Sequence, residues 1–374
     1  MSYTVISADG HLDLTFLPKD MFVSQAPRES RELVPHVRET SEGVFWFAEE
    51  GNQLDRYGFE PTGTRFLGGG KREQTLTAAG FKTGLPRTAD VPLRLADQDL
   101  DGVDGEVIYG ITSMDRRIQS KPVLTLIYEI YNEWVADWQK SAPQRLFPLG
   151  AIPNHDAELA ALSARACAAL GLWGVSFNVA TASAPIWDSS WAPLWRTLEE
   201  LEFPVALHAF TISSNVMGGS PGTHQDVVAA AGASVITPAR ADESAAGLIF
   251  GGVFEQYPKL VVGLGESGIG WLPYLLERMD YTYEDRIDTS LDLRRLPSEY
   301  FKSNMFATYI KDQVGTRVMW ELGYLDNIMW STDYPHADST WPNSQDAIAW
   351  TFAGLPDTVK RACMHDNVCR AYRI

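Results

Sequence analysis

The stretch SADGHLD at residues 7–13 places a carboxylate and an imidazole two residues apart, close to the start of the chain. Asp9 and His11 follow the β-prone run at residues 3–6. Alternate residues of a strand point to the same face, so the two side chains are expected to converge on one place. Two polar groups that converge at the end of a strand either solvate each other or bind something.

Four other polar residues stand in the same kind of position, at or just past the end of an apolar run. They are His208 after PVAL, Glu266 after LVVGLG, and Asp333 and His336 in NIMWSTDYPH. If these runs are parallel strands of a barrel, their carboxyl ends share one face, and the active sites of barrel enzymes lie on that face. Imidazoles and carboxylates together form a ligand set that suits Zn²⁺, Mn²⁺ or Fe²⁺. Such a metal lowers the pKa of a bound water toward ~7, and a neighbouring carboxylate or imidazole manages the proton.

Each of these residues also has a structural explanation. Asp9 precedes a glycine and could cap a turn, and His11 could be an interior histidine with a hydrogen-bond partner. His208, Glu266 and Asp333 are harder to explain in this way, because a polar group that ends a buried strand needs a partner. Basic residues are scarce nearby in the sequence, so a metal is the simplest source of positive charge.

Aromatic residues also lie close in sequence to the predicted site. Trp271 and Trp330 could line an apolar pocket for a flat substrate, and core packing is the alternative. His336 is predicted to contact the substrate or to support the metal ligands.

The elements that must position these residues follow a repeating pattern. From about residue 94, apolar runs alternate with longer helical patterns, and such strands are typical of parallel sheets covered by helices. Adding the run near the start gives about eight strands, which favours the α/β class and a closed (β/α)₈ TIM barrel. We predict strands at 105–110, 146–152, 172–178, 204–209, 259–267, 304–310 and 327–336, and helices at 121–141, 156–171, 188–202, 244–258 and 271–287.

One segment interrupts this alternation. Residues 14–93 lie between the first strand and the next clear one, and they are rich in proline, glycine and charge. The chain is therefore interpreted as one barrel domain, 1–374, with 14–93 as a long insertion after strand one. Because the insertion leaves the carboxyl end of that strand, it could form a lid; a surface excursion or a subunit contact are the alternatives.

Composition limits the classes of partner. The 374 residues carry a formal net charge of −17, which argues against a surface that binds nucleic acid and against binding to anionic membranes. Three scattered cysteines fit a reducing cytoplasm. We see no signal peptide, and no apolar run approaches the ~18 residues of a membrane helix. A small-molecule substrate in the cytoplasm is the resulting expectation.

Several of these motifs together resemble a known family. SADGHLD, VALHA, LIFGGVFEQYPKLVVGLGESGIGWLPYLLERMD, STDYPH and HDNVCRAYRI are similar to the amidohydrolase-related branch (amidohydrolase family 2) of the amidohydrolase superfamily. This branch includes aminocarboxymuconate-semialdehyde decarboxylase and resorcylate-type decarboxylases. The resemblance runs from the first strand to the C-terminal helix, and residues 14–93 match least.

The resemblance implies a (β/α)₈ barrel with one divalent metal, usually zinc or manganese. Carried over by position, the ligands would be Asp9, His11, His208 and Asp333. Many relatives have a proton-carrying histidine after strand six, where this chain has Glu266. Glu266 could therefore act as a general base, orient a ligand or bind a second metal. Relatives are often homodimers.

Four functions remain open at this stage. The first is a metal-dependent hydrolase in which metal-bound water attacks a small carboxylate-bearing or aromatic substrate while Glu266 or Asp333 moves the proton. The second is a metal-dependent, non-oxidative decarboxylase, a carbon–carbon lyase. The third is an iron- or manganese-dependent oxygenase of the same barrel family. The fourth is a catalytically silent barrel, which the intact set of ligand residues argues against.

Overall fold

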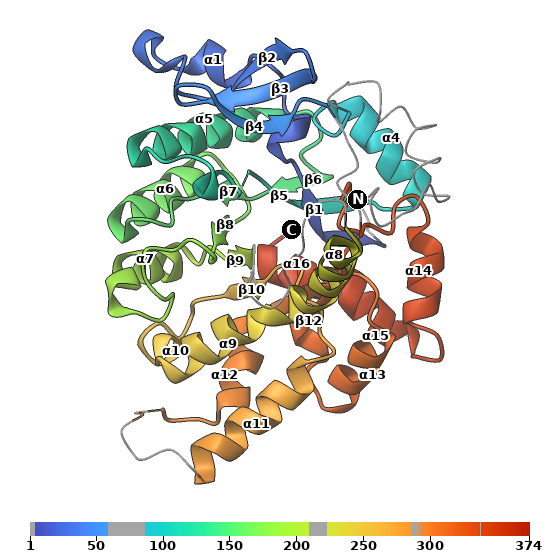
Figure 1. Ribbon diagram of the computed structural model, residues 1–374. Helices are drawn as coiled ribbons and strands as arrows, with labels where there is room; N and C mark the ends of the chain where they lie inside the picture. Colours follow the sequence, from blue (N-terminus) through green and yellow to red (C-terminus); the bar gives the residue numbers. More distant parts are fainter. Residues whose placement is uncertain are drawn as a thin grey trace.

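In the computed structural model of this protein, short parallel strands run through the centre and helices surround them (Figure 1). The structure describes residues 4–58, 87–111, 113–208, 223–285, 291, 293–336 and 338–374. The parallel strands are β1 (Ile6–His11), β5 (Gly105–Tyr109), β6 (Leu146–Pro148), β7 (Gly150–Ala151), β8 (Val175–Asn178), β9 (Val205–His208), β10 (Val262–Leu264), β11 (Met305–Tyr309) and β12 (Ile328–Trp330).

These strands form a closed ring in chain order. One ladder runs β1-β5-β6 and the other runs from β7 through β12. β6 and β7 are one strand interrupted at Leu149, whose N–H donates to the Ile108 carbonyl at 2.9 Å. The ring closes where the N–H of His11 donates to the Tyr334 carbonyl at 2.7 Å and that of Asp333 to the Asp9 carbonyl at 3.0 Å. The predicted (β/α)₈ barrel is confirmed.

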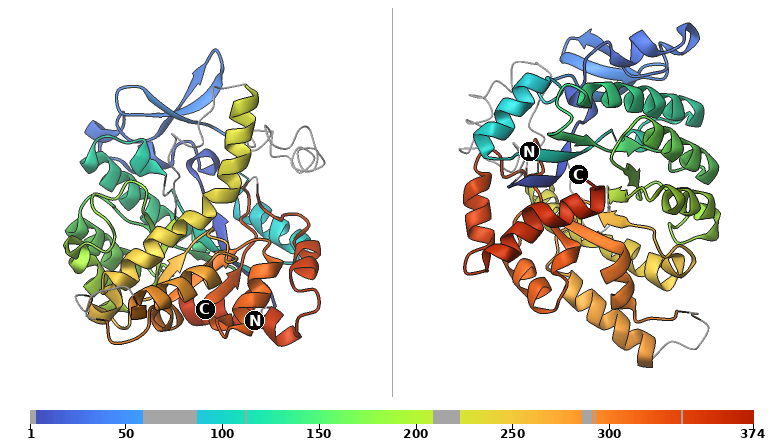
Figure 2. Two further views of the ribbon diagram at one scale, coloured as in Figure 1. Left: turned by 60° about the horizontal axis from the view of Figure 1, so that its bottom comes forward. Right: turned by 180° about the vertical axis from the view of Figure 1, so that it is seen from behind.

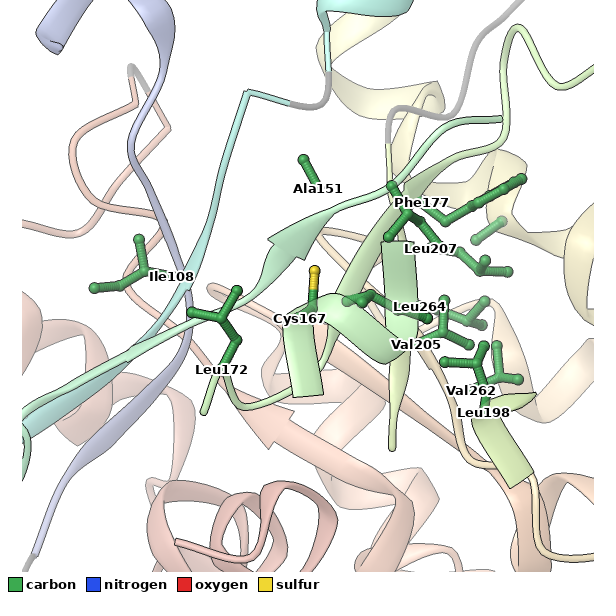
Figure 3. Packing of buried hydrophobic residues seen from close by; sticks show 14 of the residues in the cluster. Ile108, Ala151, Cys167, Leu172, Phe177, Leu198, Val205, Leu207, Val262 and Leu264 are labelled. Atoms are coloured by element: carbon green, nitrogen blue, oxygen red, sulfur yellow. The ribbon is translucent and has the colours of Figure 1, made fainter. Parts of the chain in front are cut away.

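Two hydrophobic clusters fill the barrel and its surroundings. Strand residues that face inward form the smaller cluster, which α16 (Asn367–Tyr372) completes with Val368 and Tyr372. Outward-facing strand residues pack against the helices in a much larger cluster. Figure 3 shows part of this outer layer, where Val205, Val262 and Leu264 lie near Leu198 of α7 (Ala192–Leu201). Strands that are apolar on both faces are what this arrangement requires.

The helices begin and end at residues suited to those positions. Asp156 accepts a hydrogen bond from the N–H of Leu159 at the start of α6, and Gly171 follows the helix with φ +77°. The helices that surround the ring are α4 (Val91–Asp101), α5 (Lys121–Gln139), α6 (Ala157–Ala169), α7 (Ala192–Leu201), α8 (His224–Ile236), α9 (Ala241–Phe250), α10 (Val253–Gln256), α11 (Leu272–Asp285), α12 (Pro297–Asn304), α13 (Gln313–Glu321), α14 (Ser344–Thr351), α15 (Asp357–Arg361) and α16.

Helix α8 is an element that the sequence patterns did not predict. Residues 224–236 read HQDVVAAAGASVI, in which small and apolar residues follow one another without a polar face. The amphipathic periodicity that identifies a surface helix is therefore missing. The left view of Figure 2 shows α8 (yellow) projecting from the barrel on the same side as the blue sheet near the N-terminus. Within the described part of the chain, no helix has the length and apolar character needed to cross a membrane.

The described part of the insertion after strand one contains α1 (Met21–Gln25) and a small antiparallel sheet, β2 (His36–Thr40), β3 (Gly43–Ala48) and β4 (Asn52–Arg56). This sheet lies beside the N-terminal end of α5 (Figure 1). Glu49, in the β3–β4 turn, accepts hydrogen bonds from the N–H groups of Gln119 and Ser120 at 2.9 and 2.7 Å. Residues 59–86 lie outside the described residues, so the lid within 14–93 stays a prediction.

Candidate metal centre

The predicted polar residues follow four strands whose carboxyl ends share one face of the barrel. Asp9 and His11 belong to the end of β1, and His208 ends β9. Glu266 follows β10, and Asp333 and His336 follow β12. The ring order places β1 beside β12 and β9 beside β10, so residues from both ends of the chain can meet.

The side chains of these residues are in contact. The Nε2 atom of His11 lies 3.2 Å from Oδ1 of Asp9 and 3.1 Å from Oδ1 of Asp333. Nε2 of His208 lies 3.3 Å from Oε2 of Glu266. The His11 ring stacks on His336 with centroids 3.8 Å apart and meets His208 edge-on at 5.1 Å. The structure therefore brings together all six residues that the sequence predicts around the metal.

The polar atoms at the centre are buried and lack hydrogen bonds. Asp9 and Asp333 are 0% exposed, His11 is 1% exposed and His208 is 7% exposed. Atoms without a hydrogen-bond partner are Asp9 Oδ1, His11 Nε2, His208 Nδ1 and Nε2, and both carboxylate oxygens of Asp333. Unpaired buried groups of this kind are costly, because each has lost its hydration without a replacement. Their nitrogen and oxygen atoms are the ligands that zinc, manganese or iron accepts, so the residues fit a divalent cation.

The electrostatics of the centre favour positive charge. Burial and the neighbouring His336 each lower the pKa of His11, but contact with the carboxylates of Asp333 and Asp9 raises it to about 10. Burial raises the pKa of Asp333, and the charges of His336 and His11 outweigh this effect and hold it well below its usual range. Without a metal, the raised pKa values of His11 and His336 favour protons on these two rings, which supply positive charge to the carboxylates.

Backbone conformation and hydrogen bonds fix the direction of the carboxylates. Oδ2 of Asp9 accepts hydrogen bonds from the Glu266 N–H at 2.9 Å and the Thr308 hydroxyl at 3.0 Å, which leaves Oδ1 toward His11. Glu266 and Asp333 have φ values of +50° and +54°, the left-handed region that side chains other than glycine rarely adopt. Such backbone strain concentrates at functional sites, where the surrounding structure holds it in place.

A buried ion pair supports β1 from behind. Arg94, fully buried, lies 2.8 Å from the Glu106 carboxylate and donates to the carbonyl oxygen of His11 at 3.0 Å. Glu106 reaches over Gly10, where an added Cβ would lie only 1.8 Å from Oε1 of Glu106. Gly10 is therefore required between Asp9 and His11 so that the carboxylate can approach the strand.

Three residues near the centre were missed by sequence reasoning. Asp13 lies with Oδ2 2.8 Å from Nε2 of His336. Tyr109, at the end of β5, packs its ring 5.1 Å from His208, and burial raises the pKa of its hydroxyl. Thr308 lies within an apolar strand, so no local sequence pattern indicates it. Asp13 could have been found, because it continues the alternate spacing of Asp9 and His11.

A second polar cluster lies on the same face of the barrel, at the carboxyl ends of β5, β7 and β8. Asp115 is buried and accepts hydrogen bonds from the side-chain amides of Asn178, at 2.8 Å, and Asn154. Asn178 is paired in register with His208, so the cluster adjoins the metal centre. Burial raises the pKa of Asp115 to about 6, although Thr181 and Arg116 partly oppose that shift.

The two predicted pocket tryptophans have different surroundings. Trp330 is fully buried in the outer cluster, whereas its neighbour Met329 belongs to the inner one. This burial agrees with core packing, the alternative for Trp330, and a contact of Trp330 with substrate stays a prediction. Trp271 is half-buried and donates its indole N–H to the Ser267 carbonyl at 2.8 Å, and its place in a substrate pocket stays a prediction.

Comparisons with known proteins agree with the barrel fold. A protein-family profile described as amidohydrolase matches residues 115–374. A gamma-resorcylate decarboxylase from Polaromonas sp. is 26% identical over 215 residues, which cover 54% of this chain and 64% of the relative. The chain thus spans less than two thirds of the length of that curated relative.

Solved structures share the fold. An amidohydrolase from Mycobacterium avium subsp. paratuberculosis superposes with a TM-score of 0.76 at 17% identity, covering 100% of both chains. A dihydroxybenzoic acid decarboxylase from Polaromonas sp., solved with manganese and the inhibitor 2-nitroresorcinol, gives a TM-score of 0.64 at 18% identity. That superposition covers 100% of this chain and 97% of the other.

We predict that Glu106→Gln lowers the free energy of unfolding by about 3 kcal/mol, because it leaves the buried Arg94 charge without its counterion. Denaturant unfolding measures the change. The matched control is Asp99→Asn, since Asp99 pairs with Arg145 at 2.7 Å but is 66% exposed, and its loss is expected to cost less than about 1 kcal/mol. Equal costs for the two variants would contradict a supporting role of the buried pair.

We also predict that Asp115→Asn removes a pH dependence of stability. The folded protein holds the Asp115 proton up to a pKa of about 6, above the unfolded value of 3.8. The unfolded chain releases this proton at a lower pH than the folded protein does. The free energy of unfolding of the wild type therefore falls, by up to about 3 kcal/mol, as pH rises from about 4 to 6. The free energy of unfolding, measured with denaturant at several pH values across this range, should fall for the wild type relative to the variant. Parallel curves for the two proteins would show that the Asp115 carboxyl is not shifted.

Proposed function

Because the chain belongs to the amidohydrolase family, with a match over more than half its length, we propose that it is a metal-dependent, non-oxidative decarboxylase of a small aromatic or enoic acid. The observation that carries this proposal is the set of buried nitrogen and oxygen atoms that converge at the mouth of the barrel without hydrogen bonds. The named activity of the curated Polaromonas relative supports decarboxylation over the hydrolysis that the sequence favoured.

Asp9, His11, His208 and Asp333 would hold the metal. Their mixed nitrogen and oxygen donors suit zinc or manganese, and iron as well. A cation held there would supply positive charge that attracts the anionic carboxylate of a substrate. Thr308 and the Glu266 N–H keep Oδ2 of Asp9 occupied, so the chain presents Oδ1 to the centre.

Glu266 is positioned to move the proton. Decarboxylation breaks the bond between the substrate carbon and its carboxyl carbon, releases carbon dioxide and requires one proton on the carbon left behind. The Glu266 side chain is 34% exposed, whereas Asp9 and Asp333 are fully buried. A carboxyl at the rim can take a proton from solvent at Oε2 and deliver it inward. It stands where the resemblance implies a histidine.

Hydrolysis is the second candidate, and Glu266 is the observation that favours it. A carboxylate in the place of that histidine can accept a proton from water, which is the task of a general base. The two reactions have different products, so one substrate panel separates them. Release of carbon dioxide from hydroxybenzoates marks decarboxylation, and cleavage of esters, amides or lactones without it marks hydrolysis.

We predict that the manganese-loaded protein releases carbon dioxide from a hydroxybenzoic acid and that His208→Ala loses both activity and most bound metal. The variant removes a buried ligand nitrogen, and its fold should persist, as circular dichroism will test. His224→Ala is the control, because His224 is exposed on α8. Stoichiometric metal in folded His208→Ala protein would refute the ligand assignment.

Glu266→Gln should retain the metal but lower kcat by about 10²–10⁴-fold, because the amide has the same shape and no transferable proton. Steady-state kinetics and elemental analysis measure the two effects. Glu42→Gln, at an exposed position, serves as the control. Turnover equal to that of the wild type would remove Glu266 from the mechanism.

A further inference from the structure

The residues that would hold the metal occupy only part of the barrel mouth. They lie at the ends of β1, β9 and β12, whereas the polar cluster of Asp115, Asn154 and Asn178 follows β5, β7 and β8. In the ring, β5, β7 and β8 lie between β1 and β9. Asn178 is paired in register with His208, so the two sets of side chains adjoin on neighbouring strands. A small acid held by its carboxylate at the cation can therefore bring its other end to this cluster.

The side-chain amide of Asn154 is fully used on its nitrogen and unused on its oxygen. Its Nδ2 atom donates toward the Asp115 carboxylate, the Asn178 carbonyl at 3.0 Å and the Thr181 hydroxyl at 2.8 Å. Three acceptors around two hydrogens fix the orientation of this amide. In the part of the chain that the structure describes, Oδ1 of Asn154 is buried and accepts no hydrogen bond. This oxygen therefore lacks a donor, which a ligand can supply.

Asp115 collects the donors of the cluster. Its Oδ1 atom accepts a hydrogen bond from Nδ2 of Asn178 at 2.8 Å, and Asn154 and Thr181 also bond to its carboxylate. Asn178 uses its own Oδ1 atom to accept the N–H of Ala180 at 2.9 Å. The amide groups thus point their hydrogens into the cluster. What the cluster can present to a ligand is oxygen that accepts hydrogen bonds.

The charge of the cluster is negative at neutral pH. Burial raises the pKa of Asp115 to about 6, and the Thr181 hydrogen bond and the positive charges of Arg116 and Lys121 oppose that shift only in part. The carboxyl is therefore mostly ionised near pH 7, although its surroundings disfavour negative charge. A second carboxylate brought to this place would be repelled, whereas a hydroxyl or amino group could donate a hydrogen bond.

The cluster is shielded from water as closely as the proposed metal ligands are. Asp115, Asn154 and Asn178 are all buried, like Asp9 and His208. Hydrogen bonds and charges act more strongly in such surroundings than in water, and an unpaired polar group is correspondingly costly there. A ligand whose polar group matches the cluster should therefore be clearly preferred to one whose group does not.

We propose that Asp115 and Asn154 form a specificity site, which selects acids that carry a hydroxyl or amino group remote from the carboxylate at the cation and rejects acids that carry a second carboxylate there. The proposal rests on the proposed function only in placing the first carboxylate at the cation. Oδ1 of Asn154 and the carboxylate of Asp115 accept the hydrogen bonds of the ligand, and Asn178 orients Asp115 through its Nδ2–H.

Binding of substituted salicylic acids to the manganese-loaded full-length protein tests this proposal. Each acid carries a hydroxyl, an amino, a methyl or a second carboxyl group, either meta or para to the first carboxyl group. Stopped-flow tryptophan fluorescence gives the dissociation constants before turnover, and release of carbon dioxide is measured separately. At one of the two positions, the hydroxyl and amino acids should bind about 10-fold more tightly than the methyl acid, and the dicarboxylic acid about 10-fold more weakly.

Asp115→Asn should bind the dicarboxylic acid nearly as well as the methyl acid, because the variant lacks the repelling charge. Its affinity for the methyl acid should equal that of the wild type. Asp137→Asn is the matched control, since the Asp137 side chain is 79% exposed on α5, and it should keep the wild-type order of affinities. If Asp115→Asn fails to fold, the order of affinities in the wild type decides.

Equal affinity of the wild type for the hydroxyl, amino and methyl acids at both positions overturns the specificity site, as does tight binding of the dicarboxylic acids. An Asp115→Asn protein that weakens all acids by the same factor shows a structural role alone and also overturns it. Preference for the donor-bearing acids without release of carbon dioxide overturns the decarboxylase and leaves the specificity site standing. Release of carbon dioxide without that preference does the reverse, and failure of every acid to bind overturns both.

Discussion

The cost of removing charge from water governs the mouth of this barrel. Asp9 and Asp333 are carboxylates with no exposed surface, and His11 and His208 present ring nitrogens that form no hydrogen bonds. A buried carboxylate is tolerated only when a positive partner lies close by. Each of these groups alone destabilises the folded protein, because it has lost its hydration. Held together by the fold, they attract a cation strongly, since a bound cation would offset that cost.

The surrounding structure maintains that arrangement from several directions. Thr308 occupies one oxygen of Asp9, and the ion pair of Arg94 with Glu106 holds the backbone behind His11. Gly265 leaves space for neighbouring rings, because a Cβ there would approach His208 and Tyr109 to 3.0 Å. None of these groups is a metal donor in the proposed centre, yet each restricts the positions that a donor can take. Preorganisation of this kind reduces the reorganisation that binding would otherwise require.

The sequence predicted much of this arrangement because strand ends are readable from local patterns. The apolar runs before His208, Glu266 and Asp333 located the carboxyl ends of three strands, and the barrel topology then implied that they meet. What the patterns could not supply is direction and register. For Trp330, three residues before Asp333, the sequence left pocket lining and core packing open, and its place in the outer cluster agrees with core packing. Thr308 and Tyr109 lie within apolar strands, where only the paired neighbour reveals their contacts.

The closure of the ring between β1 and the segment after β12 has a consequence for biosynthesis. The N–H of Thr332 donates to the hydroxyl of Ser7 across 325 residues of sequence, and the His11 N–H bonds to Tyr334. β1 must therefore wait, with one edge unpaired, until the residues that follow β12 have been translated. Contacts of such separation are slow to form, and an open strand edge invites association with other chains. Nascent protein that is cut short before residue 333 would lack one side of the cation pocket, whatever the state of the rest.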